Sequence, residues 1–170
     1  MEDLPIYYWG APGSGRSTSI QSVLPDKSIV LGDRKYFIQI SSRRLSLEYS
    51  SAVSKFFYAA ADVDRPQAVI PALERLCKAI GIVFVVDTQQ PRLAHNIGAL
   101  ARLREDLRRG GRDLDEIPVV FQLNKRDLPG LAPNEVLRSA LHSGRCSYIE
   151  SVASRGEGTR EALEHLLCMI

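Results

Sequence analysis

Residues 4–9 of the chain read LPIYYW, and residues 10–17 continue as GAPGSGRS. The first segment is short, apolar and aromatic, which predicts a β-strand; the second is a glycine-rich turn entering a helix at residues 17–24, which Pro25 ends. This order of strand, turn and helix is typical of the phosphate-binding loop G-x-x-x-x-G-K-[ST], and only Arg16, in place of lysine, departs from it. The stretch therefore predicts a P-loop α/β fold.

The loop predicts specific phosphate contacts. Backbone N–H groups of such a loop surround phosphate oxygens, and the positive end of the following helix adds to them. Arg16 keeps a positive charge, but its planar fork is bulkier and differently directed than a lysine, so the replacement is not conservative. Taken alone, the stretch also fits a glycine-rich turn with a surface arginine. The residues predicted to bind phosphates are Gly10, Gly13, Ser14, Gly15, Arg16, Ser17 and Thr18, with Ser17 also placed to give its hydroxyl to Mg²⁺.

Strands and helices alternate along the rest of the chain. Residues 80–86 and 117–123 are apolar runs typical of strands covered on both faces, and a long helix between them ends at Gly110-Gly111. Other patterned segments are hairpin strands at 43–49 and 55–61, helices at 67–79, 134–142 and 159–167, and a strand at 145–149. Residues 26–42 show no clear pattern. The order predicts one three-layer α/β domain, residues 1–170, with a mostly parallel sheet and one antiparallel hairpin.

The sequence N-K-x-D follows the strand at 117–123, as Asn124, Lys125 and Asp127. A carboxylate at Asp127 can accept from N1–H and the exocyclic amine of guanine, two donors that adenine lacks. Lys125 can lay its methylene stem over the purine face, and Asn124 can tie neighbouring loops together. Alone, the pattern also fits a polar turn after a strand. Together with the phosphate loop it predicts a guanine-nucleotide site.

On these motifs the chain resembles the MglA-type bacterial small GTPases of the Ras superfamily. The similar segments are residues 6–10, 81–89, 110–118 and 124–129. The resemblance implies a Ras-like fold, GTP or GDP as the bound nucleotide with Mg²⁺ as its metal ion, and a role in cell polarity or motility. It also implies a protein partner at the switch face, for which a Roadblock-type (MglB-like) homodimer is the candidate. Val152, Ala153 and Ser154 stand where the family has S-A-K, whose alanine N–H meets the guanine carbonyl oxygen.

The resemblance fails over residues 26–66, where the family keeps its switches. Lys35 stands where switch I has a threonine, and Pro66, which has no N–H, stands where switch II has a glycine that bonds the γ-phosphate. Gln67 would take the place of a water-orienting glutamine, although it also fits a solvated first-turn helix residue. The departures predict a guanine-nucleotide-binding, protein-binding regulatory module with weak or absent GTP hydrolysis. The alternatives are an active GTPase switch with a rebuilt switch region and a nucleotide-free scaffold.

The composition indicates which kinds of partner, metal site and cellular location the sequence favours. The net charge is +2, and the arginines are dispersed among acids, which argues against nucleic acid as the main partner. Cys77, Cys146 and Cys168 form no C-x-x-C pair, so the sequence suggests neither a zinc site nor a disulfide framework and favours a cytoplasmic location. Cys168 is third from the end, which does not fit a prenylation box, and no direct membrane anchor is expected.

Overall fold

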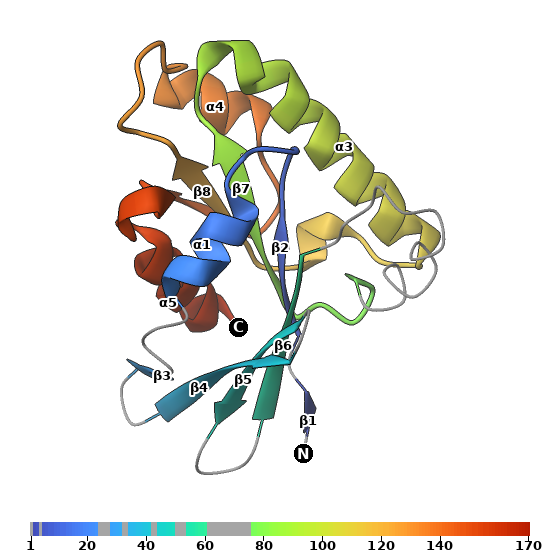
Figure 1. Cartoon of the computed structure of the whole chain (residues 1–170). Coiled ribbons are helices and arrows are strands. Elements are labelled where there is room, and N and C mark those ends of the chain that lie inside the picture. Colours follow the sequence, from blue (N-terminus) through green and yellow to red (C-terminus); the bar gives the residue numbers. More distant parts are fainter. Residues whose placement is uncertain are drawn as a thin grey trace.

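The described part of the chain forms one mixed β-sheet with helices on both faces (Figure 1). This computed structural model describes residues 2–3, 5–23, 28–31, 34–41, 44–49, 54–60 and 76–170. The strand order is β3-β4-β5-β6-β2-β7-β8-β9, and β1 pairs with β6 outside that path. The strands are β1 Glu2–Asp3, β2 Ile6–Trp9, β3 Ser28–Leu31, β4 Arg34–Ser41, β5 Arg44–Tyr49, β6 Ser54–Ala60, β7 Gly81–Asp87, β8 Val119–Asn124 and β9 Cys146–Glu150.

One half of the sheet is parallel. β2 pairs with β6 and β7, β7 with β8, and β8 with β9 in parallel ladders. Every residue of β7 and β8 is buried, which explains the continuous apolar runs of these strands, since both of their faces are covered. The arrangement confirms the predicted α/β class. It also brings the carboxyl ends of the parallel strands to one edge, where sheets of this kind bind their ligands.

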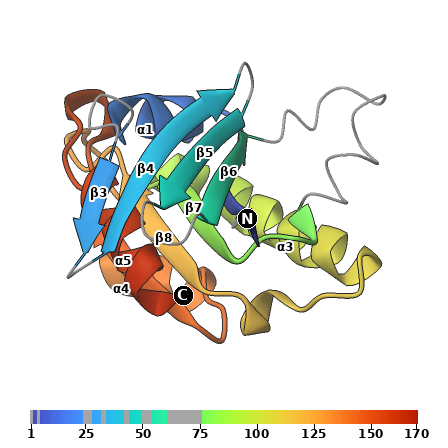
Figure 2. The same cartoon turned by 90° about the horizontal axis from the view of Figure 1, so that it is seen from below.

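The other half is an antiparallel meander of β3, β4, β5 and β6 (Figure 2). The predicted hairpin is present as the β5–β6 pair, in which Leu45 lies opposite Tyr58. The prediction of a single hairpin was incomplete, because the unassigned segment at residues 26–42 contributes β3 and β4. β4 is paired on both sides, and its residues 36–40 (YFIQI) are mostly aromatic and β-branched residues typical of strands, a signal that the sequence analysis overlooked.

Helices cover the sheet in two layers. They are α1 Arg16–Val23, α3 Leu93–Arg109, α4 Asn134–Ala140 and α5 Thr159–Met169. Alternate residues of each strand point to opposite faces: Ile6 and Tyr8 pack with α1 and α5, whereas Tyr7 and Trp9 pack with α3 and α4. The predicted helix at 67–79 lies largely outside the described residues. In the described part of the chain, no helix combines the length and apolar character needed to cross a membrane.

The long helix α3 is held to the end of β2 by a tryptophan. Leu100, Leu103 and Leu107 of α3 are buried, as their spacing predicts, whereas Ile97 is 42% exposed. Trp9 is almost fully buried, and its indole N–H donates to the Ala99 carbonyl at 3.0 Å. Because Gly10 follows Trp9 directly, this bond anchors the entry to the glycine-rich loop against α3.

Candidate nucleotide-binding site

The glycine-rich loop connects β2 to α1 at the ligand edge of the sheet, as predicted. Gly10 has φ of 148° and Gly15 has φ of 102°, values that other residues rarely adopt. A Cβ atom on Gly10 would also collide with the Val85 carbonyl, and one on Gly15 would collide with the amide of Asn124. Glycine is therefore required at both positions so that the loop can approach β7 and the N-K-x-D segment closely.

Asn124 ends β8 and joins three segments. Its Nδ2 donates to the Ser14 carbonyl at 2.8 Å, while its Oδ1 accepts from the Ala153 N–H at 2.9 Å and from Ser151 Oγ at 3.3 Å. Asn124 is 2% exposed, and these three bonds use most of the hydrogen-bonding capacity of its side chain. The predicted tie between neighbouring loops is present.

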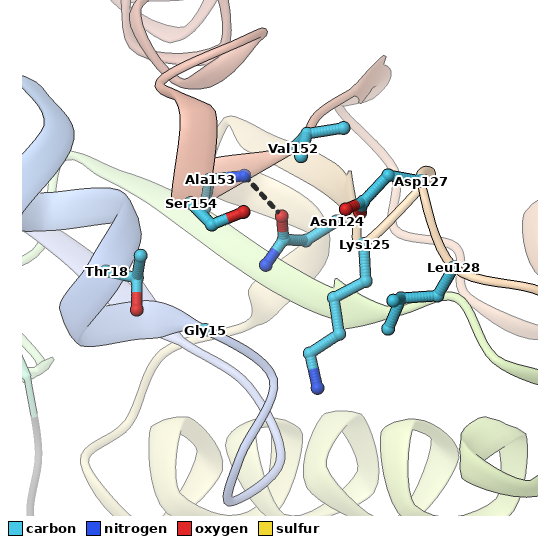
Figure 3. A pocket seen from close by; sticks show the side chains of 9 residues that line it. All are labelled: Gly15, Thr18, Asn124, Lys125, Asp127, Leu128, Val152, Ala153 and Ser154. Atoms are coloured by element: carbon cyan, nitrogen blue, oxygen red, sulfur yellow. Dashed lines mark hydrogen bonds between the residues drawn. The ribbon is translucent and has the colours of Figure 1, made fainter.

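A pocket of about 220 Å³ opens at this junction (Figure 3). It is lined by residues of the three predicted segments and by one further residue: Gly15, Thr18, Asn124, Lys125, Asp127, Leu128, Val152, Ala153 and Ser154. Leu128 was not predicted; it follows the motif directly and adds apolar surface to the wall. The polar groups of the pocket are few and converge on one apolar cavity, as is typical of a small-molecule site.

Lys125 adopts a left-handed backbone conformation, with φ of 65°. Its ammonium bonds the carboxylate of Asp87 at 2.7 Å, so the aliphatic stem forms part of the pocket wall. Arg92, in the short helix η3 (Gln90–Arg92), lies 3.6 Å from the same carboxylate. Sequence reasoning did not assign Asp87 or Arg92 to the site. The sequence did contain a signal for Asp87, because it is a charged residue at the end of the apolar strand β7, on the edge of the sheet where ligands bind.

A second polar layer lies below the pocket and was also missed. Gln122 in β8 is buried, and its amide donates to Ser19 Oγ at 2.8 Å and to Ser151 Oγ at 3.1 Å. Ser19 Oγ in turn donates to the Gly15 carbonyl at 2.9 Å. The network connects α1 with the loops on either side of the pocket, which holds the pocket floor in one arrangement.

The loop after β9 differs in one respect from its predicted role. The backbone N–H of Ala153, which the resemblance assigns to the guanine carbonyl, donates to Asn124 Oδ1. A bound guanine would share this donor with Asn124. Val152 and Ala153 are buried and Ser154 is exposed, and all three line the pocket; their contact with the base stays a prediction.

Asp127, the predicted base acceptor, lines the pocket and faces a cation on its other side. Arg155 Nη2, at the end of the short helix η5 (Ala153–Arg155), lies 3.8 Å from Asp127 Oδ2. The arginine side chain is 60% exposed and the aspartate side chain 24%, so the pair is screened by solvent. The carboxylate therefore retains lone pairs for a ligand.

Several predicted residues are not brought into this pocket. Arg16 is half-buried at the start of α1, and Ser17 is exposed there. Among the described residues, no cluster of three histidine, cysteine, aspartate or glutamate side chains could hold a metal ion. Lys35 lies in β4, opposite Val30 of β3. Pro66 and Gln67 lie outside the described residues.

The sheet topology, the loop and the position of N-K-x-D together define the fold as that of a P-loop small GTPase of the Ras-like type. The chain is 40% identical over 84 residues to the mutual gliding-motility protein MglA of Myxococcus xanthus (strain DK1622), which confirms the resemblance inferred from the motifs. The match covers 49% of this chain and 43% of MglA, so it spans less than half of that relative. No family model matches the chain.

Proposed function

We propose that the chain binds a guanine nucleotide and serves as a protein-binding regulatory module with weak or absent GTP hydrolysis. The observation that carries this proposal is the pocket in which Asp127, Lys125 and Ala153 meet the glycine-rich loop. An acceptor-only carboxylate beside an aliphatic wall fits the donor edge and the face of guanine. The exposed hydroxyl of Ser17 at the start of α1 fits a Mg²⁺ ligand that would neutralise phosphate charge.

The regulatory part of the proposal rests on the first half of the sheet. The segment that the resemblance aligns with switch I continues into β4, and Figure 1 draws this strand beyond α1, away from the glycine-rich loop. A strand paired on both sides is not free to wrap around a γ-phosphate. Together with Arg16, this arrangement favours a module whose nucleotide serves mainly to hold the fold, in contact with a protein partner of the kind that MglA-type regulators use.

The decisive experiment identifies the nucleotide released when the purified protein is denatured. We expect GDP or GTP in a stoichiometric amount, and exchange with added GDP should then be measurable by titration. An adenine nucleotide would overturn the assignment of the base pocket. A protein that carries no nucleotide and binds no added GDP would replace the proposal with the nucleotide-free scaffold.

A further inference from the structure

The carboxylate of Asp87 joins parts of the pocket that lie far apart in the sequence. Its Oδ2 accepts from Lys125 at 2.7 Å and lies 3.6 Å from Arg92 Nε, while its Oδ1 accepts from the Gln89 N–H at 3.2 Å. Only 2% of the residue is exposed. A buried carboxylate needs partners of this kind, and here each cation also belongs to a segment of the nucleotide pocket or contacts one.

The backbone of Asp87 is held as firmly as its side chain. Asn96 of α3 is fully buried; its Oδ1 accepts from the Asp87 N–H at 3.2 Å, and its Nδ2 donates to the Asp87 carbonyl at 2.7 Å. The two bonds align the end of β7 with the first turn of α3. The position of Asp87 is therefore fixed by the backbone, and its carboxylate fixes the positions of the Lys125 and Arg92 head groups.

Arg92 carries the link onward to the glycine-rich loop. Its Nη2 donates to the Pro12 carbonyl at 2.7 Å. The described peptide bonds are all trans, and in a trans peptide the carbonyl and the following N–H point in opposite directions. The Gly13 N–H is thus turned away from Arg92. The bond to Arg92 therefore favours the orientation of this peptide in which the Gly13 N–H faces away from Arg92.

We propose that Asp87 is a positioning residue that couples the two halves of the nucleotide site. Through Lys125 it holds the aliphatic wall of the base pocket, and through Arg92 it directs a backbone amide of the phosphate-binding loop. This inference rests on the proposed binding of guanine nucleotide. It assigns to Asp87 and Arg92 a role that neither the loop motif nor N-K-x-D contains.

The test compares GDP with GMP in titrations of three variants. Arg92→Met keeps the aliphatic stem but removes the donor, and we expect it to weaken GDP about two- to tenfold while GMP changes less, because GMP has only one phosphate to place in the loop. Asp87→Asn removes the charge that holds both cations, so it should weaken GMP through the base wall and weaken GDP by at least as much. Arg102→Met is the matched control. Arg102 lies in α3 and forms a comparable ion pair, with Asp106 at 3.7 Å, but it does not line the pocket.

A second measurement needs no nucleotide. Lys125→Met leaves Asp87 buried with one cation fewer, so it should destabilise the protein, and adding Asp87→Asn should recover part of that loss. Unfolding can be followed through the fluorescence of Trp9. Independent, additive effects of the two substitutions would overturn the link between Asp87 and Lys125.

The outcomes separate the inference from the proposed function. If the wild-type protein binds GDP and Arg92→Met and Asp87→Asn bind it equally well, Asp87 positions nothing and the inference alone is wrong. Equal weakening of GDP and GMP by Arg92→Met, in step with lower stability, would indicate a purely structural role and would also overturn it. A wild-type protein that binds no guanine nucleotide removes the proposed function and this inference together.

Discussion

The base side of the site and the segment aligned with the switches are built differently. On the base side, Asn124 and Lys125 are each bonded to neighbouring segments, and the pocket already exists in the chain by itself. On the other side, the aligned segment continues into β4 of an antiparallel meander. Under the proposed function, recognition of the nucleotide base and the response to a γ-phosphate would depend on separate parts of the chain, so base recognition could be retained while the switch segment changes.

The largest effect is expected from removing the predicted acceptor for the base, Asp127. Asp127→Asn replaces an acceptor-only group with a mixed donor and acceptor. Two charge-assisted hydrogen bonds would be lost, so we expect GDP affinity to fall about 100-fold or more, while affinity for xanthosine diphosphate rises because xanthine has a carbonyl where guanine has an amine. Titration with both nucleotides measures the exchange. Unchanged GDP affinity would mean that the base pocket has been misassigned.

The next prediction concerns the arginine of the phosphate loop. Arg16→Lys restores the usual compact charge and should tighten GDP about tenfold. Hydrolysis of GTP by both proteins should stay at or below about 3–5 × 10⁻⁴ s⁻¹, the unassisted Ras rate, because the substitution supplies no contact that orders the attacking water. Single-turnover release of phosphate gives the rate. A wild-type rate of order 1 s⁻¹ without a partner would contradict the proposed function.

A smaller effect is expected for partner binding. A nucleotide shifts a conformational equilibrium only by its differential affinity for the two states. With Lys35 in β4 and Pro66 unable to donate, affinity for a protein partner should differ by less than about tenfold between the GDP-loaded and GTP-analogue-loaded forms. Calorimetric titration of an MglB-like homodimer into both forms provides the comparison. A hundredfold difference would favour the active GTPase switch instead.

The smallest predicted effect concerns the rim of the pocket. Arg155 presents guanidinium N–H groups to Asp127 at 3.8 Å, and guanine would present a similar pair of donors to the same carboxylate. Arg155→Ala should therefore raise GDP affinity, by no more than about fivefold because the pair is solvent-exposed. Arg108→Ala, an exposed arginine of α3, is the control. A loss of affinity in Arg155→Ala would show that the arginine assists the base instead of competing with it.

Features that depend on residues close together in the sequence were predicted better than features that depend on residues far apart in it. β7, β8 and α3 are encoded locally, by an apolar run or by leucines at helical spacing, and they lie where predicted. β4 is an exception, because residues 36–40 (YFIQI) are a local run of β-forming residues that was overlooked, and its pairing with β3 and β5 could not be read from the sequence. The loop and N-K-x-D are contiguous motifs and were recognised. The contacts of Asp87 and Arg92 were not, because they join residues 38 and 80 positions apart.

Trp9 gives the protein an optical reporter of its own. It is the sole tryptophan of the chain, its indole is bonded to α3, and it directly precedes the loop proposed to hold phosphates. Indole emission responds to the polarity and hydrogen bonding of its surroundings. Loading of the loop, or separation of α3 from the sheet, can therefore be followed in the unlabelled wild-type protein by intrinsic fluorescence.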